Sequence, residues 1–276
     1  MIVLMAIEGY GPGGQVVMPL RIPVFYAHYA FTPAIPERDA PTLEPTREPL
    51  VDHIVVILDE SVMGSHLELN GYPRPTTPRL RELAARAEAK TLGVCSSAAN
   101  YSVGSLLAML SGTKAESLVD DYDRVLTRPS MIAYGARAGY RALLLNSQDY
   151  LPWIAHERNT LGDRLDAKSV DRNRAPAWEW DDSMIEHAVT FVASNPRTLN
   201  FIAKRGLHTP YHDKSPPDRR PFAPYLESAA WSDDLIENIN TYDNGILWSV
   251  DGYLARLHEG LAKTGRSVLV IYTSDQ

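Results

Sequence analysis

The chain has 276 residues, 45% of them hydrophobic, which is enough to bury the core of one large domain. Its formal net charge of −7 argues against nucleic acid as the main ligand, because binding to phosphate backbones needs basic patches. The single cysteine, Cys95, excludes an intramolecular disulfide framework.

The first fifty residues do not have the pattern of a folded core. Met1–Ile7 is apolar but is followed at once by Glu8, without a basic n-region or a cleavage-like end, which argues against a signal peptide. Val16–Phe31 contains Arg21 and two prolines and falls short of the ~20 apolar residues of a transmembrane helix. It favours a peripheral packing arm, with a segment lying on a membrane surface as the alternative.

Thr32–Leu50 is rich in proline, glutamate and arginine, a composition typical of an extended segment. We therefore expect residues 1–50 to form an N-terminal arm and Pro-rich lead-in, and residues 51–276 to form one folded domain.

His53–Leu58 is the first predicted strand, a short apolar run with β-branched residues of the kind that parallel sheets bury. A helix is predicted over Thr76–Lys90, with Thr77 as its cap. A shorter helix is predicted over Ser102–Gly112, with Ser102 at its cap and the glycine at its stop.

The alternation of helices and strands continues through the second half of the chain. A helix at Ser130–Tyr140 precedes a strand at Arg141–Asn146, and a helix at Asp182–Asn195 precedes a strand at Thr198–Ala203. Residues 147–181 show little periodicity and predict an irregular insertion.

Asp234–Lys263 has a strong helical pattern, followed by a last predicted strand at Ser267–Tyr272. The apolar residues of this helix share one stripe: Leu235, Ile239, Tyr242, Ile246, Val250, Leu254, Leu257 and Leu261.

Strands that alternate with helices predict a three-layer α/β sandwich with a mostly parallel central sheet. Ligand sites in such sheets lie outside the carboxyl ends of the strands. Three polar clusters fall there: Asp59 with Glu60, the region around His208, and Ser274 with Asp275.

Acidic residues follow both the first and the last strand. We expect the strands that end at Leu58 and Tyr272 to lie close together, so that Glu60 and Asp275 converge on a hard divalent cation. The alternative is that these acids cap the helices that follow them.

Ser102 is the candidate nucleophile. A hydroxyl at a helix N-terminus lies beside free N–H groups, where a phosphate can dock, and a metal can lower its pKa. The alternative is an ordinary N-cap serine, and Ser96, Ser97 and Ser105 are rival hydroxyls.

His208 and His212 follow the strand at Thr198–Ala203, beyond a tight turn that Gly206 permits. Either imidazole could donate to an anionic oxygen, and the alternative is a structural histidine.

Four segments together resemble one known family. The segment VVILDESVMGSHLELNGYPRPTTPRL at Val55–Leu80 resembles the start of the catalytic domain of the phosphoethanolamine transferases. These enzymes are a branch of the alkaline phosphatase and sulfatase superfamily. Their Gly-Ser-His-Gly-Pro-x-Tyr segment resembles RGLHTPYH, and their late helix resembles NTYDNGILWSVDGYLARLHEGL. Their Tyr-x-Ser-Asp-His-Gly motif resembles VIYTSDQ, and the likeness runs in the family's order from about Val51 to Gln276.

The resemblance implies roles for particular residues. Glu60 and Asp275 fall on metal-binding positions, and Ser102 falls on the nucleophile, which also contacts the metal. His208 falls on the histidine that holds the substrate phosphate. Asp59 stands where these transferases have glycine, and is a weaker metal candidate.

Several family features are replaced or missing. Gln276 stands at the position of a metal-binding histidine, and Ala203 at that of another histidine. The family's disulfide cysteines, its N-terminal transmembrane helices and the part beyond its Ser-Asp motif have no counterpart here. The resemblance therefore implies an alkaline phosphatase/sulfatase-like catalytic domain at 51–276 that is truncated at its C-terminus. Zinc is the implied cofactor, with Mg²⁺ or Mn²⁺ as alternatives because an amide oxygen replaces an imidazole nitrogen.

The resemblance implies a metal-dependent phosphoethanolamine-type transferase. It would move a phospho-head group from a phospholipid donor to a lipid or glycan hydroxyl through a covalent phospho-Ser102, in lipopolysaccharide modification at the periplasmic face of the inner membrane. One alternative is a sulfatase-like phosphodiesterase or hydrolase, although no Pro-x-Arg follows Cys95 or Ser102 as formylglycine chemistry requires. The other alternative is a non-catalytic remnant of the fold.

Overall fold

The fold is known from a computed structural model, which describes residues 37–44, 48–120, 122–148, 157–158, 160–173 and 175–275. Residues 37–276 form one compact unit. The packing arm predicted at Val16–Phe31, residues 32–36 and 45–47 of the Pro-rich lead-in, and Gln276 lie outside the described residues.

Part of the lead-in packs on the domain. The Arg38 guanidinium lies 2.7 Å from the Glu157 carboxylate, with both side chains buried, and it donates to the Arg128 carbonyl at 2.8 Å. Asp39 N also donates to the Thr127 carbonyl. The domain boundary near Val51 stays a prediction.

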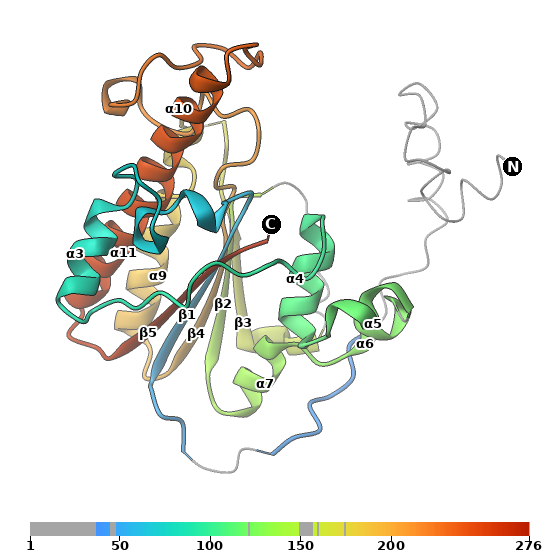
Figure 1. The fold of residues 1–276 in the computed structure, drawn as a ribbon. Helices are drawn as coiled ribbons and strands as arrows, with labels where there is room; N and C mark the ends of the chain where they lie inside the picture. The colour runs from blue at the N-terminus through green and yellow to red at the C-terminus, as the bar shows by residue number, and fades with distance from the viewer. Residues whose placement is uncertain are drawn as a thin grey trace, which may run out of the picture. The chain divides into compact units, whose positions relative to one another are not determined.

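Five parallel strands of the described chain form one sheet in the order β3-β2-β4-β1-β5 (Figure 1). They are β1 (His53–Asp59), β2 (Arg141–Asn146), β3 (Leu165–Ser169), β4 (Thr198–Ala203) and β5 (Val268–Ser274). The register of β1 and β5 runs from His53 opposite Val268 to Asp59 opposite Ser274. The predicted parallel sheet and the predicted proximity of the first and last strands are therefore confirmed.

Helices cover both faces of the sheet, which makes three layers (Figure 1). On one face lie α3 (Pro78–Ala85), α9 (Ser183–Ser194), α10 (Leu235–Gly245) and α11 (Tyr253–Ala262). On the other lie α4 (Ser102–Ser111) and α7 (Met131–Arg137), with α5 (Ala115–Asp120) and α6 (Tyr122–Thr127) beside them. Short 3₁₀ turns occupy Gly64–His66, Glu68–Asn70, Gly162–Arg164, Ala177–Glu179 and Pro217–Arg219.

The central strands are buried on both sides, as their continuous apolar runs require. Val55 and Ile57 of β1 belong to the core under α9 and α11, whereas Val56 and Leu58 belong to the core under α4 and α7. Each core excludes water from one face of the sheet.

The irregular insertion predicted at 147–181 is wrong in one part, because it contains β3. Of the five residues of β3 only Leu165 is buried, so this edge strand lacks the apolar run by which the other strands were recognised.

The helix predicted over Asp234–Lys263 is one continuous rod, but its middle is a π-helix at Ile246–Gly252. Four-residue steps connect Tyr242, Ile246, Val250 and Leu254 on the predicted stripe, and all four are buried. In an α-helix, side chains four residues apart rotate progressively around the helix axis, because one turn holds only 3.6 residues. The π-helix has more residues per turn and keeps these side chains on one face.

The cap of α3 comes from a distant residue. Thr77 holds the predicted N-cap position, but its hydroxyl accepts from Leu69 N at 2.9 Å and makes no cap hydrogen bond. Instead the buried Asp251 carboxylate of the π-helix accepts from Leu80 N at 2.9 Å and Arg79 N at 3.3 Å. This carboxylate joins the first turn of α3 to the π-helix.

Asp251→Asn tests the electrostatic cost of that junction. Burial raises the pKa of Asp251 to about 6, although the two N–H groups of α3 oppose the shift. The folded chain thus holds the proton more tightly than the unfolded chain, so the wild type loses stability as pH rises from about 4 to about 6. Between pH 4 and pH 6 we expect the free energy of unfolding of the wild type to fall by up to about 3 kcal/mol relative to that of Asp251→Asn. Urea unfolding at each pH measures this difference.

The exposed Asp218 supplies the control, because its side chain is 77% exposed. Asp218→Asn should leave the pH profile of the wild type unchanged. An Asp251→Asn profile parallel to the wild type between pH 4 and 6 would contradict the assignment.

Candidate functional site

Three of the predicted site residues meet at the carboxyl edge of the sheet. Glu60 directly follows β1 and Asp275 directly follows β5, and Asp275 N donates to the Asp59 carbonyl at 3.0 Å. Ser102 begins α4, and its hydroxyl donates to Glu60 Oε1 at 3.1 Å. The structure therefore brings Glu60, Ser102 and Asp275 together.

Ser102 is not the N-cap of its helix. Tyr101 holds that position, and the prediction of Ser102 at the cap is wrong by one residue. The Ser102 hydroxyl is free of capping and is directed at Glu60. By contrast, the rival hydroxyls of Ser97 and Ser105 both donate to the Ala99 carbonyl, at 2.6 and 3.1 Å. Of these three serines, only Ser102 faces the carboxylates.

The two carboxylates face one another in a buried position. Burial, and after it the adjacent Asp275 carboxylate, raise the pKa of Glu60 to about 7. Asp275 Oδ1 accepts from Ser61 N at 2.9 Å, but its buried Oδ2 has no hydrogen-bond partner among the described residues. Two opposed carboxylates with an unpartnered buried oxygen fit a divalent cation, which would neutralise both.

The donor set consists of oxygen atoms. No group of three His, Cys, Asp or Glu side chains comes together within the described ranges, so the two carboxylates and the Ser102 hydroxyl form the candidate set. Oxygen donors suit Mg²⁺ or Mn²⁺, whereas Zn²⁺ favours nitrogen and sulfur.

Asp59 is engaged elsewhere and does not join this set. Its Oδ2 lies 2.5 Å from Lys204 Nζ and accepts from the Tyr272 hydroxyl at 2.8 Å, and its Oδ1 accepts from Glu60 N at 3.0 Å. Asp59 thus supports Lys204, Tyr272 and the backbone of Glu60, and its weaker metal candidacy stays a prediction.

The turn after β4 is held by the backbone carbonyl of Glu60 and by the carboxylate of Asp181. Leu207 N donates to the Glu60 carbonyl at 2.9 Å. The Asp181 carboxylate accepts from Arg205 N at 3.0 Å and from Gly206 N at 3.1 Å. Gly206 has a φ of +49°, and a Cβ there would overlap Asp59 Oδ1. Only glycine allows the turn to approach this closely.

His208 lies one residue beyond this turn and is exposed. Its Nδ1 lies 2.7 Å from the Thr209 carbonyl, which can only accept, so Nδ1 carries the hydrogen. No hydrogen bond joins His208 to Glu60, Ser102 or Asp275 among the described contacts. Its predicted role in holding the substrate phosphate stays a prediction.

Gln148 is a site residue that the sequence reasoning missed. Its amide nitrogen lies 2.9 Å from the Lys204 carbonyl and 3.4 Å from Glu60 Oε2. It follows β2 at the same sheet edge, so its position after a predicted strand was a usable signal. It was instead assigned to the irregular insertion.

Comparison with known proteins identifies the family. A family model described as Sulfatase matches residues 52–276, more than half of the chain. The chain belongs to the sulfatase family.

Within this family, the chain is similar to phosphoethanolamine transferases, as the sequence motifs predicted. Phosphoethanolamine transferase EptA from Helicobacter pylori is 29% identical over 266 residues, which are 93% of this chain and 48% of that protein. The chain thus spans about half the length of this relative.

Solved structures confirm the fold. The periplasmic domain of EptC from Escherichia coli, crystallised with zinc, matches with a TM-score of 0.64 at 21% identity, covering 86% of this chain and 68% of that domain. The integral membrane lipooligosaccharide phosphoethanolamine transferase A from Neisseria meningitidis matches with a TM-score of 0.69 at 18% identity, covering 94% of this chain and 49% of that one. Within the described part of this sulfatase-family chain, no helix has the length and apolar character needed to cross a bilayer.

Gly206→Ala tests the close approach of the turn to the site, with Gly162→Ala as a matched control. Both glycines have a positive φ, +49° and +52°, so alanine is strained by about 1–2 kcal/mol at either position. A Cβ at 162 meets nothing within 4 Å, whereas one at 206 overlaps Asp59 Oδ1 and lies 2.8 Å from the Glu60 carbonyl.

We expect urea unfolding to show a loss of about 1–2 kcal/mol for Gly162→Ala and a clearly larger loss for Gly206→Ala. Equal losses in the two variants would show that the turn does not press on Asp59 and Glu60.

Proposed function

We propose that residues 51–276 form the catalytic domain of a metal-dependent phosphoethanolamine transferase. The observation that carries this proposal is the Ser102 hydroxyl at a helix N-terminus, 3.1 Å from Glu60 Oε1 and beside an Asp275 carboxylate with an unpartnered oxygen. A nucleophile, an anion-binding helix end and two cation ligands at one sheet edge suit transfer of a phosphoryl group.

Glu60, Asp275 and the Ser102 hydroxyl would hold the divalent cation. When bound, the cation would lower the pKa of the hydroxyl and neutralise negative charge on the substrate phosphate. The structure of an EptC domain with zinc supports a divalent metal in this family. For this chain we propose Mn²⁺ or Mg²⁺ as the better fit, with zinc as the family alternative, because the described donors are oxygens.

In the proposed first step Ser102 Oγ bonds to the phosphorus of a phosphatidylethanolamine-like donor. The hydroxyl proton leaves along its hydrogen bond to Glu60 Oε1, and the bond from phosphorus to the diacylglycerol oxygen breaks. That oxygen departs and takes the proton from Glu60, which restores the Glu60 carboxylate. In the second step the hydroxyl oxygen of the acceptor bonds to the same phosphorus, the bond to Ser102 breaks, and the proton of the acceptor restores the serine hydroxyl.

We assign auxiliary roles to two residues near Glu60. His208 would donate from Nε2 to a phosphoryl oxygen only as an imidazolium, since the Thr209 carbonyl already holds the hydrogen on Nδ1. Gln148 would orient Glu60 through its amide nitrogen.

The donor would be a phospholipid, and the acceptor a hydroxyl of a lipid or glycan. The names of the relatives support this choice, since they include a lipooligosaccharide phosphoethanolamine transferase. The periplasmic assignment of an EptC domain supports the same location for this chain, against a membrane surface.

Hydrolysis with water as the acceptor is the second candidate, favoured by the sulfatase family match itself. It would share Ser102, Glu60 and Asp275 and would differ only in the last step. The absence of Pro-x-Arg after Cys95 and after Ser102 argues against a formylglycine sulfatase.

Ser102→Ala tests the nucleophile. Incubation with a short-chain phosphatidylethanolamine should add one phosphoethanolamine group to wild-type Ser102, seen by intact-protein mass spectrometry, and Ser102→Ala should reduce the rate of labelling by at least about 10³-fold. Ser97→Ala and Ser105→Ala are matched controls and should label normally, because both hydroxyls face the Ala99 carbonyl. Full labelling of Ser102→Ala would refute the assignment.

Metal binding can be measured without turnover. Mn²⁺ at 100 times its dissociation constant should raise the thermal midpoint of the wild type by roughly 5 °C or more, because the cation relieves repulsion between Glu60 and Asp275. Asp275→Asn should remove most of this rise, whereas Asp166→Asn, at a 44% exposed surface carboxylate, should retain it.

Zn²⁺ should act more weakly than Mn²⁺ on the wild type, and Gln276→His should strengthen the effect of Zn²⁺ by supplying a nitrogen donor. An equal Mn²⁺ response in Asp275→Asn and the wild type would contradict the proposed ligand set.

A further inference from the structure

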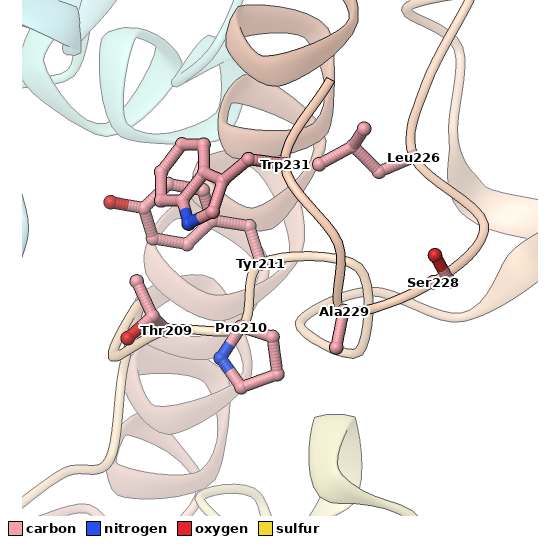
Figure 2. A pocket seen from close by; sticks show the side chains of 7 residues that line it. All are labelled: Thr209, Pro210, Tyr211, Leu226, Ser228, Ala229 and Trp231. Atoms are coloured by element: carbon pink, nitrogen blue, oxygen red, sulfur yellow. The ribbon is translucent and has the colours of Figure 1, made fainter. Parts of the chain in front are cut away.

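A small hollow opens beside the segment that follows His208. Its volume is 270 Å³. Thr209, Pro210 and Tyr211 line it from the segment after His208, and Leu226, Ser228 and Trp231 line it from the loop before α10 (Figure 2). The proposed reaction uses none of these residues.

The lining of the hollow is aromatic and uncharged. Tyr211 and Trp231 meet edge to face with ring centroids 5.2 Å apart, and Trp231 is 63% exposed. None of the residues that line the hollow carries a charge at neutral pH. An exposed indole face beside uncharged walls suits a neutral ligand with apolar ring faces.

Several polar groups at the hollow lack partners. Among the described residues, no hydrogen bond reaches the hydroxyl of Thr209, the hydroxyl of Tyr211 or the indole N–H of Trp231. The Ser228 hydroxyl accepts only a 3.4 Å contact from Ala230 N. A ligand that fills the hollow without offering hydrogen bonds would desolvate these groups at a cost.

The hollow adjoins the reaction centre through one side chain. The Tyr211 ring contacts the Tyr242 ring at a centroid distance of 5.1 Å. The Tyr242 hydroxyl donates to the Ser61 carbonyl at 2.8 Å, and the Ser61 hydroxyl donates to Glu60 Oε1 at 2.9 Å. Two aromatic rings, those of Tyr211 and Tyr242, would therefore separate a ligand in the hollow from the loop that carries Glu60.

We propose that this hollow is the acceptor subsite and binds one sugar ring of a glycan, stacked on Trp231. This inference rests on the proposed transferase function. A sugar ring presents C–H faces to the indole and hydroxyls to Thr209, Tyr211 and Ser228, so it matches both kinds of lining group.

Other parts of the substrates fit the hollow less well. A phosphate would find no positive side chain in its lining. An acyl chain would leave the hydroxyls of Thr209 and Tyr211 without partners. The volume of 270 Å³ lies just below the usual range of small-molecule pockets, about 300–1,000 Å³, and suits a single ring rather than a diacylglycerol.

The test compares Trp231→Ala with Leu235→Ala in the full chain. Leu235 is 73% exposed on the neighbouring turn but does not line the hollow. The probe is deacylated lipooligosaccharide, which contains the glycan without acyl chains, and its binding is measured by calorimetry. Trp231→Ala should weaken binding by about 3–10-fold, the loss expected for one aromatic contact, while Leu235→Ala should bind as the wild type.

Activity gives a second readout. With the same glycan as acceptor, Trp231→Ala should raise KM by a similar factor and affect KM more than kcat, whereas Leu235→Ala should keep the KM of the wild type. Unchanged glycan binding in Trp231→Ala, or displacement of the glycan by dihexanoyl phosphatidylethanolamine, would overturn the subsite. Failure of Ser102 labelling would refute the transferase reaction separately, because calorimetric binding does not depend on turnover.

Discussion

The buried ammonium group of Lys204 holds the carboxyl edge of the sheet together. Its Nζ lies 2.5 Å from Asp59 Oδ2 at the end of β1 and donates to the Ser249 carbonyl of the π-helix at 2.5 Å. Both side chains of the ion pair are fully buried. Burial raises the pKa of Asp59, and the Lys204 charge opposes that shift. Loss of one partner would leave an uncompensated buried charge, which typically costs 3–5 kcal/mol.

This pair fixes the position of the residues that carry the chemistry. Asp59 accepts from Glu60 N, and the turn from Lys204 to Leu207 returns to the Glu60 carbonyl. The backbone around Glu60 is therefore set before any ligand arrives. By contrast, neither Glu60 nor Asp275 forms an ion pair within the described part of the chain, and the adjacent Asp275 carboxylate raises the pKa of Glu60. The fold therefore carries a local electrostatic cost at these two carboxylates.

Periodicity revealed the elements that are buried on two faces or along one stripe. The strands β1, β2 and β4 follow from buried apolar runs. β5 also follows from an apolar run, although none of its residues is buried in the described structure. The pairing of β1 with β5 followed from the acids that end them. The short strand β3 was missed because only Leu165 is buried. The capping of α3 by Asp251 and the π-helix depend on contacts between distant residues, which spacing along the chain does not encode.

Some residues of the candidate site could be predicted from the sequence, and others only from the folded structure. Ser102, Glu60 and Asp275 were found from their places at the ends of predicted elements. The partner of Asp59 could not be found, because a lysine after a strand is ordinarily a surface residue and its burial is a tertiary property. Gln148 lies in a segment without periodicity, where only the folded arrangement shows which side chains lie near Glu60.

The strand that precedes Asp275 is also the least covered: β5 pairs with β1 alone among the described strands, and Leu269 and Ile271 are each 45% exposed. Its amides should therefore exchange with solvent through local opening at a lower free energy than those of the enclosed β4. A cation shared by Glu60 and Asp275 would link β5 to β1 and raise the free energy of this local opening. Cation binding and the local opening of β5 would then be thermodynamically coupled.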